Sequence, residues 1–249
     1  MDGRVVDVHE QHPIFIPPTN PEVPIWRYMD LPKLVAMLCD ARLWFARADT
    51  LGDSHEGAYG SFNVSMRPSL YSEIPSEGLV QISEATRKIV RHTFINCWHM
   101  ADVESVAMWR VYAPAGQGVA VRSTYSRLIS SLTCPESVFV GTVRYVDPTK
   151  EWIPEGNLMW PFLHKRRSFE YERELRAIRS GFPSGGLSLD AESPAGHALD
   201  VDLSVLLEAV YVAPAQPTWF RDAVRQVVER FGPGDVEVRQ SDLDSDPLY

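Results

Sequence analysis

The chain of 249 residues has few cysteines, no long apolar run and no excess of positive charge. Its three cysteines, Cys39, Cys97 and Cys134, are scattered and form no CxxC pair, which argues against a disulfide framework and a zinc motif. No apolar run approaches the ~20 residues that a membrane-spanning helix needs. The N-terminal sequence MDGRVVDVHEQHP lacks the basic and then apolar pattern of a signal peptide. These absences predict a soluble, cytoplasmic protein that does not contact a membrane.

The net negative charge of the chain argues against some classes of ligand. A formal net charge of -9 argues against non-specific binding to DNA or to an acidic membrane surface, so nucleic acid is not expected as a non-specific ligand. The hydrophobic content of 45% and the charged content of 23% are typical of globular proteins. A chain of this length can bury a full hydrophobic core.

Short strands and helices are predicted to alternate along the chain. Alternating or short apolar runs predict strands at residues 25–28, 42–47, 93–98, 119–122, 138–146, 206–212 and 236–239. Apolar residues at helical spacing predict one helix after a cap at Asp30, and others at residues 83–91, 106–112, 125–132, 158–169 and 218–231. This mixture predicts an α+β fold with a mixed, mostly antiparallel sheet flanked by short helices.

The chain shows no internal repeat and no sharp shift of composition. Five prolines between residues 13 and 24 predict an extended N-terminal arm over residues 1–24, with Ile14, Phe15 and Ile16 as its anchor. We expect residues 25–249 to form a single domain. Gly, Pro and Ser are frequent at residues 180–196, which predicts a surface loop.

The segment at residues 96–124 predicts a tightly packed centre. Ser105 and Glu104 offer a cap for a helix whose apolar face would carry Val106, Trp109 and Tyr112. Cys97 and His99, two residues apart on a strand, would share a face and could enter one cleft. A buried structural cysteine beside a hydrogen-bonded histidine is the commoner arrangement, and no third orienting group is identifiable.

An acidic turn follows the second predicted strand. Its carboxylates and histidine, Asp49, Asp53, His55 and Glu56, could hold a metal or act in acid–base chemistry, above all if they converge with His99. Acidic turns are more often simply solvated, and we favour that interpretation. No metal ligand is therefore predicted.

Residues 171–178, YERELRAI, fit a strand and a helix equally well. In a strand, Glu172 and Glu174 would share one face about 7 Å apart, and each would raise the pKa of the other. In a helix, the same residues would form local ion pairs on the surface. Arg27 has two interpretations as well: a clamp for a phosphate or carboxylate, or one half of a surface ion pair.

The order of these motifs resembles a bacterial family known as domain of unknown function 2971. The resemblance covers most of the chain from about residue 25 and lies in Trp26-Arg27-Tyr28, LWFARADTLGDSHEG from Leu43, NCWHMADVESVAMWRVYAPAGQGVAVRST from Asn96 and KRRSFEYERELRAI from Lys165. The turn Gly52-Asp53-Ser54-His55-Glu56 departs from the Asn-Asp-Pro more common in that family. The resemblance implies a fold and no established activity.

A second resemblance bears on function. Arginine on an early strand, Ser-Thr on a middle strand and Glu-x-Glu on a late strand is similar to the pattern of mono-ADP-ribosyltransferases. It implies a substrate, NAD, bound in a cleft between two small sheets into which the main sheet would be split. Glu174 and Glu172 would then be catalytic, and the cofactor-binding residues would be Arg27, Tyr28, Ser123, Thr124 and Trp98.

Two classes of function follow. The first is an NAD-dependent ADP-ribosyltransferase or NAD glycohydrolase, which the resemblances place in bacterial stress or phage defence, with a neutralising protein partner. The second is a non-catalytic module of the same fold that binds a small molecule or a protein. Convergence of Arg27, Ser123 and Glu174 on one cleft would favour the enzyme, whereas their separation by several helices would contradict it.

Overall fold

The computed structural model describes residues 12–113, 117–180 and 192–245. The strands are β1 (Pro24–Asp30), β2 (Arg42–Arg47), β3 (Thr93–Met100), β4 (Gly118–Thr124), β5 (Phe139–Thr142), β6 (Arg144–Val146), β7 (His164–Arg166), β8 (Glu174–Ser180), β9 (Gly196–Asp200), β10 (Ala209–Val212) and β11 (Glu237–Gln240). The α-helices are α1 (Leu31–Asp40), α2 (Ser61–Leu70), α3 (Ser76–Val90), α4 (Val106–Tyr112), α5 (Tyr125–Ser131), α6 (Leu203–Leu206) and α7 (Thr218–Phe231). None of the described helices is long and apolar enough to cross a membrane.

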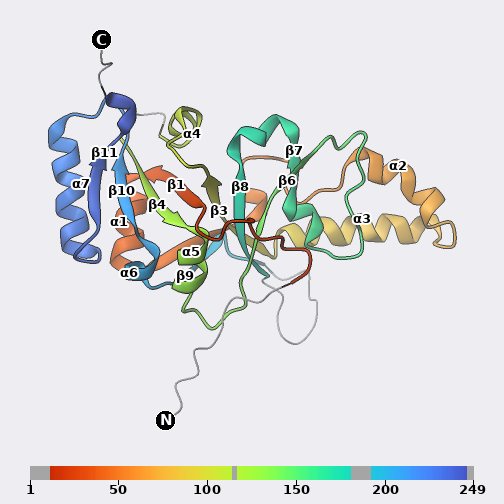
Figure 1. Cartoon of the computed structure of the whole chain (residues 1–249). Coiled ribbons are helices and arrows are strands. Elements are labelled where there is room, and N and C mark those ends of the chain that lie inside the picture. Colours follow the sequence, from red (N-terminus) through yellow and green to blue (C-terminus); the bar gives the residue numbers. More distant parts are fainter. Residues whose placement is uncertain (1–11, 114–116, 181–191, 246–249) are drawn as a thin grey trace.

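A nine-stranded sheet organises the described residues (Figure 1). Its main path runs β11-β10-β4-β1-β3-β2-β9, while β8 pairs with β3 and β5 pairs with β8. Neighbouring strands in this sheet are antiparallel except β10 and β11, which are parallel. A second, small sheet consists of β6 and β7. The predicted α+β class with a mostly antiparallel sheet is confirmed.

The sheet forks at β3. One edge of β3 pairs with β8 along a register of seven residue pairs, from Thr93↔Ser180 to His99↔Glu174. The other edge pairs with β1 only at Ile25↔Met100 and Trp26↔His99, and with β2 only at Ala46↔Ile95 and Arg47↔Phe94. Between these two short ladders β1 and β2 diverge. We call this opening the fork.

Helices cover the sheet unequally. The main core lies between the sheet and α1 and α7, where Leu34, Leu38, Val224 and Val228 are buried. On the opposite face a smaller aromatic cluster packs under α4; it contains Trp26, Tyr28, Trp109 and Tyr211. The α2 and α3 helices lie beyond the small β6–β7 sheet, at the far end from α7 (Figure 1). Residues of both α1 and α4 line the opening at the fork.

Local sequence signals set several of these boundaries. Asp30 accepts a hydrogen bond from the backbone N–H of Lys33 and caps α1, as predicted. Ser105 caps α4 in the same way through the N–H of Met108. The apolar face of α4 differs from the prediction. Met108 and Trp109 are buried, whereas Val106 and Tyr112 are 48% and 43% exposed, because this helix covers an edge of the cluster instead of lying across it.

The predicted helix at residues 158–169 is wrong. The chain there forms two 3-10 turns, Trp160–Leu163 and Arg167–Glu172, on either side of β7. Four consecutive residues, 161–164, are buried, which is more than one face of a helix can bury, and β7 gains ladder hydrogen bonds by pairing with β6.

Several other predicted strands and helices begin or end at different residues in the structure. The strand predicted at 138–146 breaks into β5 and β6, because the chain changes partner: up to Val143, whose N–H donates to the carbonyl of Glu174, it follows β8, and from Arg144 it pairs with β7. The strand predicted at 206–212 begins only at Ala209, because Asp202 caps the short helix α6 before it. The helix predicted at 83–91 begins earlier, at Ser76, and α2 was not predicted.

The N-terminal arm packs on β5. Phe15 stacks on Phe139 with ring centroids 5.1 Å apart, and the carbonyl of Ile16 accepts from the N–H of Thr142. Ile14 and Phe15 are buried as expected for an anchor, whereas Ile16 is exposed. Residues 1–11 of the arm, residues 114–116 after α4 and residues 181–191 of the predicted loop lie outside the described residues.

Candidate functional site at the fork

A cavity of about 640 Å³ opens at the fork. Its walls come from β1, β2, β3, α1 and α4, with Thr50 and Leu51 from the turn after β2, Glu174 from β8 and Ala198 from β9. The volume lies within the range of small-molecule sites. The cavity exists because β1 and β2 leave the edge of β3, so side chains instead of a neighbouring strand occupy the space.

Arg27 lies across the fork. Its guanidinium donates to the carbonyl of Cys97 on β3 and to that of Trp44 on β2, each at 3.3 Å. Asn96 donates to the same Trp44 carbonyl at 2.9 Å. These bonds satisfy backbone groups that have no strand partner at the divergence.

Arg27 has no carboxylate partner within 4.0 Å among the described residues. Lys33 and Arg42, the other cations that line the cavity, pair with Asp30 and Asp200. Burial lowers the pKa of Arg27 from its ordinary value, as expected for a guanidinium without a carboxylate beside it. An arginine in this situation suits an anionic ligand, because its planar fork matches phosphate geometry.

Glu174 reaches the cavity from β8, on the other side of β3. One carboxylate oxygen lies 2.6 Å from Nζ of Lys165 and the other lies 2.5 Å from Nε of Arg176. Arg176 is fully buried and makes a two-pronged contact with Glu56, at 2.5 and 2.9 Å. A carboxylate has about four acceptor positions, so Glu174 can still accept a hydrogen bond from a ligand.

Glu172 joins this cluster through Lys165, whose Nζ contacts both glutamates. The two glutamates do not lie on one face of a strand, as the strand interpretation of 171–178 predicted. Glu172 ends a 3-10 turn, and Arg173 follows in the left-handed region at φ 41° before β8 begins. This turn brings both carboxylates to the same ammonium group.

The buried cluster holds more negative than positive groups. Within the described part of the chain, Glu56, Glu172 and Glu174 pair only with Lys165 and Arg176, so one negative charge would remain uncompensated if all five groups were ionised. Burial and the neighbouring Glu174 raise the pKa of Glu172 to about 7. Burial would raise the pKa of Glu174 as well, but the charges of Arg176 and Lys165 hold it well below its usual range. Glu172 is therefore the group that binds a proton near neutral pH.

The aromatic residues that line the cavity differ in how much of each ring is exposed to a ligand. Tyr28 lines it, but its hydroxyl accepts from the N–H of Ser105 and its ring packs against Trp109. Trp98 lines it too, yet its side chain is 1% exposed and the Arg27 guanidinium lies 6.0 Å from its ring centroid. Trp44 and Tyr112 are 50% and 43% exposed, which makes them the rings most open to a ligand.

Ser123 and Thr124 do not line the cavity. Ser123 pairs with Ile25 in the sheet and so faces the main core, where its hydroxyl donates to the carbonyl of Leu206 at 2.5 Å. Thr124 caps α5 through the N–H of Arg127. Both hydroxyls serve the fold, and the ligand-binding roles predicted for them have no support in this geometry.

Cys97 and His99 share a face and line the cavity, as the strand spacing predicted. Burial raises the pKa of the Cys97 thiol to about 12, so the thiol is neutral near pH 7. Nδ1 of His99 lies 2.6 Å from the carbonyl of Glu172, and burial lowers the pKa of His99. A neutral thiol beside a neutral imidazole is a poor nucleophile.

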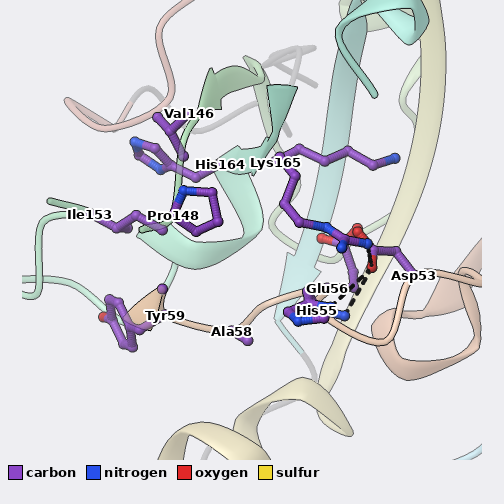
Figure 2. Close-up of a pocket in the computed structure, with 12 residues that line it drawn as sticks. Asp53, His55, Glu56, Ala58, Tyr59, Val146, Pro148, Ile153, His164 and Lys165 are labelled. Carbon is purple, nitrogen blue, oxygen red and sulfur yellow. Dashed lines mark hydrogen bonds and ion pairs between the residues drawn. The ribbon is translucent and has the colours of Figure 1, made fainter. Parts of the chain in front are cut away.

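The acidic turn does not form a metal site. Asp53 pairs with Arg166 at 2.7 Å and Glu56 pairs with Arg176, and both line a small cavity of about 30 Å³ (Figure 2). His99 is occupied with Glu172 instead of joining them. The described residues contain no group of three or more His, Cys, Asp or Glu able to hold a metal ion.

Three residues of the site take roles that the sequence does not predict. Arg176 and Lys165 belong to the charged segment that contains the two glutamates, without an assigned role, and Glu56 is predicted as a possible metal ligand or acid–base group, with a solvated turn favoured. Strand alternation over residues 174–178 would have placed Arg176 on the face of Glu174. No local signal pairs Glu56 with Arg176, because they lie 120 positions apart.

Comparison with models of known protein families found no match, so membership in domain of unknown function 2971 stays a prediction. Comparison with curated proteins found no match either. Among solved structures the chain is similar to DarT of Thermus sp. 2.9. The complex with carba-NAD+ is 11% identical, covers 91% of this chain and 100% of its own, and gives a TM-score of 0.41. The complex with ADP-ribosylated ssDNA is 10% identical, covers 93% and 99%, and gives 0.43.

Gly57 fixes the turn that presents Glu56. Its φ is +69°, and an added Cβ would lie 2.3 Å from the ring of Phe162, whose carbonyl accepts from Arg176. We expect Gly57→Ala to lower the free energy of unfolding by about 3 kcal/mol in urea titrations. Gly52→Ala is the control, because φ is +87° there and the space is open, so the loss should be only ~1 kcal/mol. Equal losses would show that Phe162 moves without cost.

Proposed function

We propose that the chain binds NAD in the cavity at the fork and cleaves its nicotinamide–ribose bond, as an ADP-ribosyltransferase or an NAD glycohydrolase. One observation carries the proposal: Arg27 and Glu174, far apart in the sequence, line the same cavity from opposite sides of β3. An uncompensated guanidinium and a fixed carboxylate in one cavity are the two groups that this chemistry needs.

Binding would use the guanidinium first. Arg27 would donate to the pyrophosphate, for which no protein carboxylate competes within 4.0 Å among the described residues. Trp44 or Tyr112 would contact a ring of the dinucleotide, because both are exposed at the cavity. Tyr28 and Trp98 would form the wall behind the phosphates.

The chemical step would use the two glutamates. Glu174 would accept a hydrogen bond from the 2′-hydroxyl of the nicotinamide ribose and stabilise positive charge on the ribose as the C1′–N bond breaks. Nicotinamide leaves with the bonding electron pair and is neutral. Water or another acceptor then bonds to C1′ and loses a proton. Glu172 does not line the cavity itself, so it would take this proton by way of the Glu174 carboxylate beside it. The products are nicotinamide, ADP-ribose on the acceptor, and one proton.

This role for Glu172 makes the rate depend on pH. With its pKa raised from 4.5 to about 7, Glu172 is protonated and inactive as a base below that pH, so the rate of NAD hydrolysis should rise with pH and level off above about 7. A raised carboxyl pKa stabilises the fold below pH 4.5 and this contribution is lost as the pH rises through 7. Initial rates between pH 5 and 9 test this, and a rate that falls across that range would contradict it.

Nicotinamide release is the first experiment. The purified chain would be incubated with NAD, and free nicotinamide would be measured by chromatography with and without candidate acceptors. Because a negative net charge does not decide what the acceptor is, single-stranded DNA and a protein mixture should both be included beside water. No release at any pH, in a protein that retains its fold, would contradict the catalytic proposal.

A non-catalytic module that binds a nucleotide is the alternative. One observation favours it: both oxygens of Glu174 are already held by cations, as in a structural ion network. Thermal shift with NAD separates the two, since a stabilised protein that releases no nicotinamide binds without turnover. A role in bacterial stress or phage defence, and a neutralising protein partner, follow from the sequence resemblances alone and stay predictions.

A further inference from the structure

Lys165 occupies a central place in the charge cluster. It lies in β7, opposite Tyr145 of β6 in the small sheet, and its side chain is only 10% exposed. Its Nζ contacts Glu172 and, at 2.6 Å, Glu174. The same ammonium lies 4.7 Å from the ring centroid of Phe169. Among the described residues it is the cation that touches both glutamates.

The cluster separates two cavities. Glu174 lines the large cavity at the fork, whereas Lys165 and Glu56 line the small one, together with Asp53 and His164 (Figure 2). The small cavity, at about 30 Å³, has room for one or two waters. Lys165 therefore contacts both glutamates and also lines the small cavity.

We propose that Lys165 is a positioning residue that holds Glu172 and Glu174 together and sets the pH at which Glu172 releases its proton. For its catalytic consequence the proposal rests on the function proposed above. The electrostatic part does not depend on NAD and can be measured on the free protein.

Several other charged or titratable groups lie close to Glu172 and Glu174. Two of them are charged: Arg176, which holds Glu174, and Glu56, which holds Arg176. The Tyr145 hydroxyl accepts from the N–H of Glu174. The remaining titratable neighbours are neutral near pH 7 or held by hydrogen bonds: Tyr112, Tyr171, Cys97 and His99. Arg173 is exposed beyond them.

Simple charge counting predicts opposite effects for two variants. Lys165→Met leaves three carboxylates with one cation, so Glu172 should keep its proton to a higher pH. Glu56→Gln leaves two carboxylates with two cations, so Glu172 should lose its proton at a lower pH. We expect each midpoint to move by at least about one pH unit, in opposite directions. Lys165→Arg keeps the charge and should leave the midpoint near that of the wild type.

The test has two readouts. Carboxyl carbon resonances of labelled glutamate report the midpoint of Glu172 in the free protein, assigned by its loss in Glu172→Gln. The pH dependence of NAD hydrolysis reports it during turnover. Glu155→Gln is the matched control, since it breaks a buried pair with Arg67 at 2.9 Å that lines neither cavity, and should shift neither readout.

Midpoints that stay unchanged, or that move the same way in Lys165→Met and Glu56→Gln, would overturn the proposal. Opposite shifts in the resonances without any NAD hydrolysis would support it while contradicting the proposed function. Should Lys165→Met not fold, Glu56→Gln and Lys165→Arg still decide: a downward shift in the first with none in the second supports the proposal, and any other pair of results overturns it.

Discussion

Replacing Glu174 by glutamine is expected to lower the rate of NAD hydrolysis at least about a hundredfold. The substitution keeps the shape of the side chain and removes the charge that would stabilise the ribose cation as nicotinamide leaves. The rate constant for nicotinamide release, measured at saturating NAD, reports the effect. A variant that keeps the full rate would remove Glu174 from the mechanism.

The same substitution should also affect stability, although less than the loss of a buried ion pair usually does. Breaking such a pair typically costs 3–5 kcal/mol, and Glu174 is buried against Lys165 and Arg176. In Glu174→Gln, however, Glu172 can ionise and compensate the two cations together with Glu56. We therefore expect a loss of about 1–3 kcal/mol, in contrast to a solvated glutamate, whose replacement would leave stability unchanged.

Glu155→Gln separates the two effects. Glu155 pairs with Arg67 and accepts from Asn63, at 2.9 Å each, in a buried site that does not line the cavity at the fork. Its replacement should destabilise the fold at least as much as Glu174→Gln while leaving the rate of NAD hydrolysis unchanged. An equal fall of the rate in both variants would show that reduced stability explains the loss.

Replacing Arg27 by methionine is expected to weaken NAD binding by about 30-fold to 1,000-fold, which corresponds to ~2–4 kcal/mol for a lost charged contact in a buried site. Stability should change little, because two effects oppose each other. The variant loses two long hydrogen bonds at 3.3 Å, but it also removes a charge that no carboxylate of the described residues approaches within 4.0 Å. Calorimetric titration with NAD measures the first effect and urea unfolding the second.

Arg42→Gln is the matched control for this prediction. Arg42 lines the same cavity, but it pairs with Asp200 at 2.6 Å in an exposed position. Its replacement should change NAD affinity less than about threefold. Equal losses in the two variants would mean that the general positive potential of the cavity, and not the geometry of Arg27, binds the ligand.

The parts of the fold that local patterns determine were predictable. The cap at Asp30, the strand at residues 42–47 and the helix at residues 218–231 follow from capping and apolar spacing alone. Residues 158–169 were not predictable in this way, because their buried residues pack against several elements and their hydrogen bonds depend on the parallel partner β6.

In the candidate site, too, some features follow from local sequence patterns and others depend on contacts between distant parts of the chain. The positions of Arg27 and Glu174 on two strands could be proposed from the sequence, but their approach depends on the fork, which arises from the way β1 and β2 share one edge of β3. Ser123 looked equivalent to them, and only its pairing with Ile25 shows that it faces the core. The contact of Glu56 with Arg176 likewise requires the folded chain.

The central claim is that Arg27 and Glu174 face one dinucleotide. A crystal structure of the chain with a non-hydrolysable NAD analogue tests it most directly. The account predicts the pyrophosphate within hydrogen-bond distance of the Arg27 guanidinium and the 2′-hydroxyl of the nicotinamide ribose within hydrogen-bond distance of the Glu174 carboxylate. An analogue bound elsewhere on the molecule, or no binding at millimolar concentration, would contradict it.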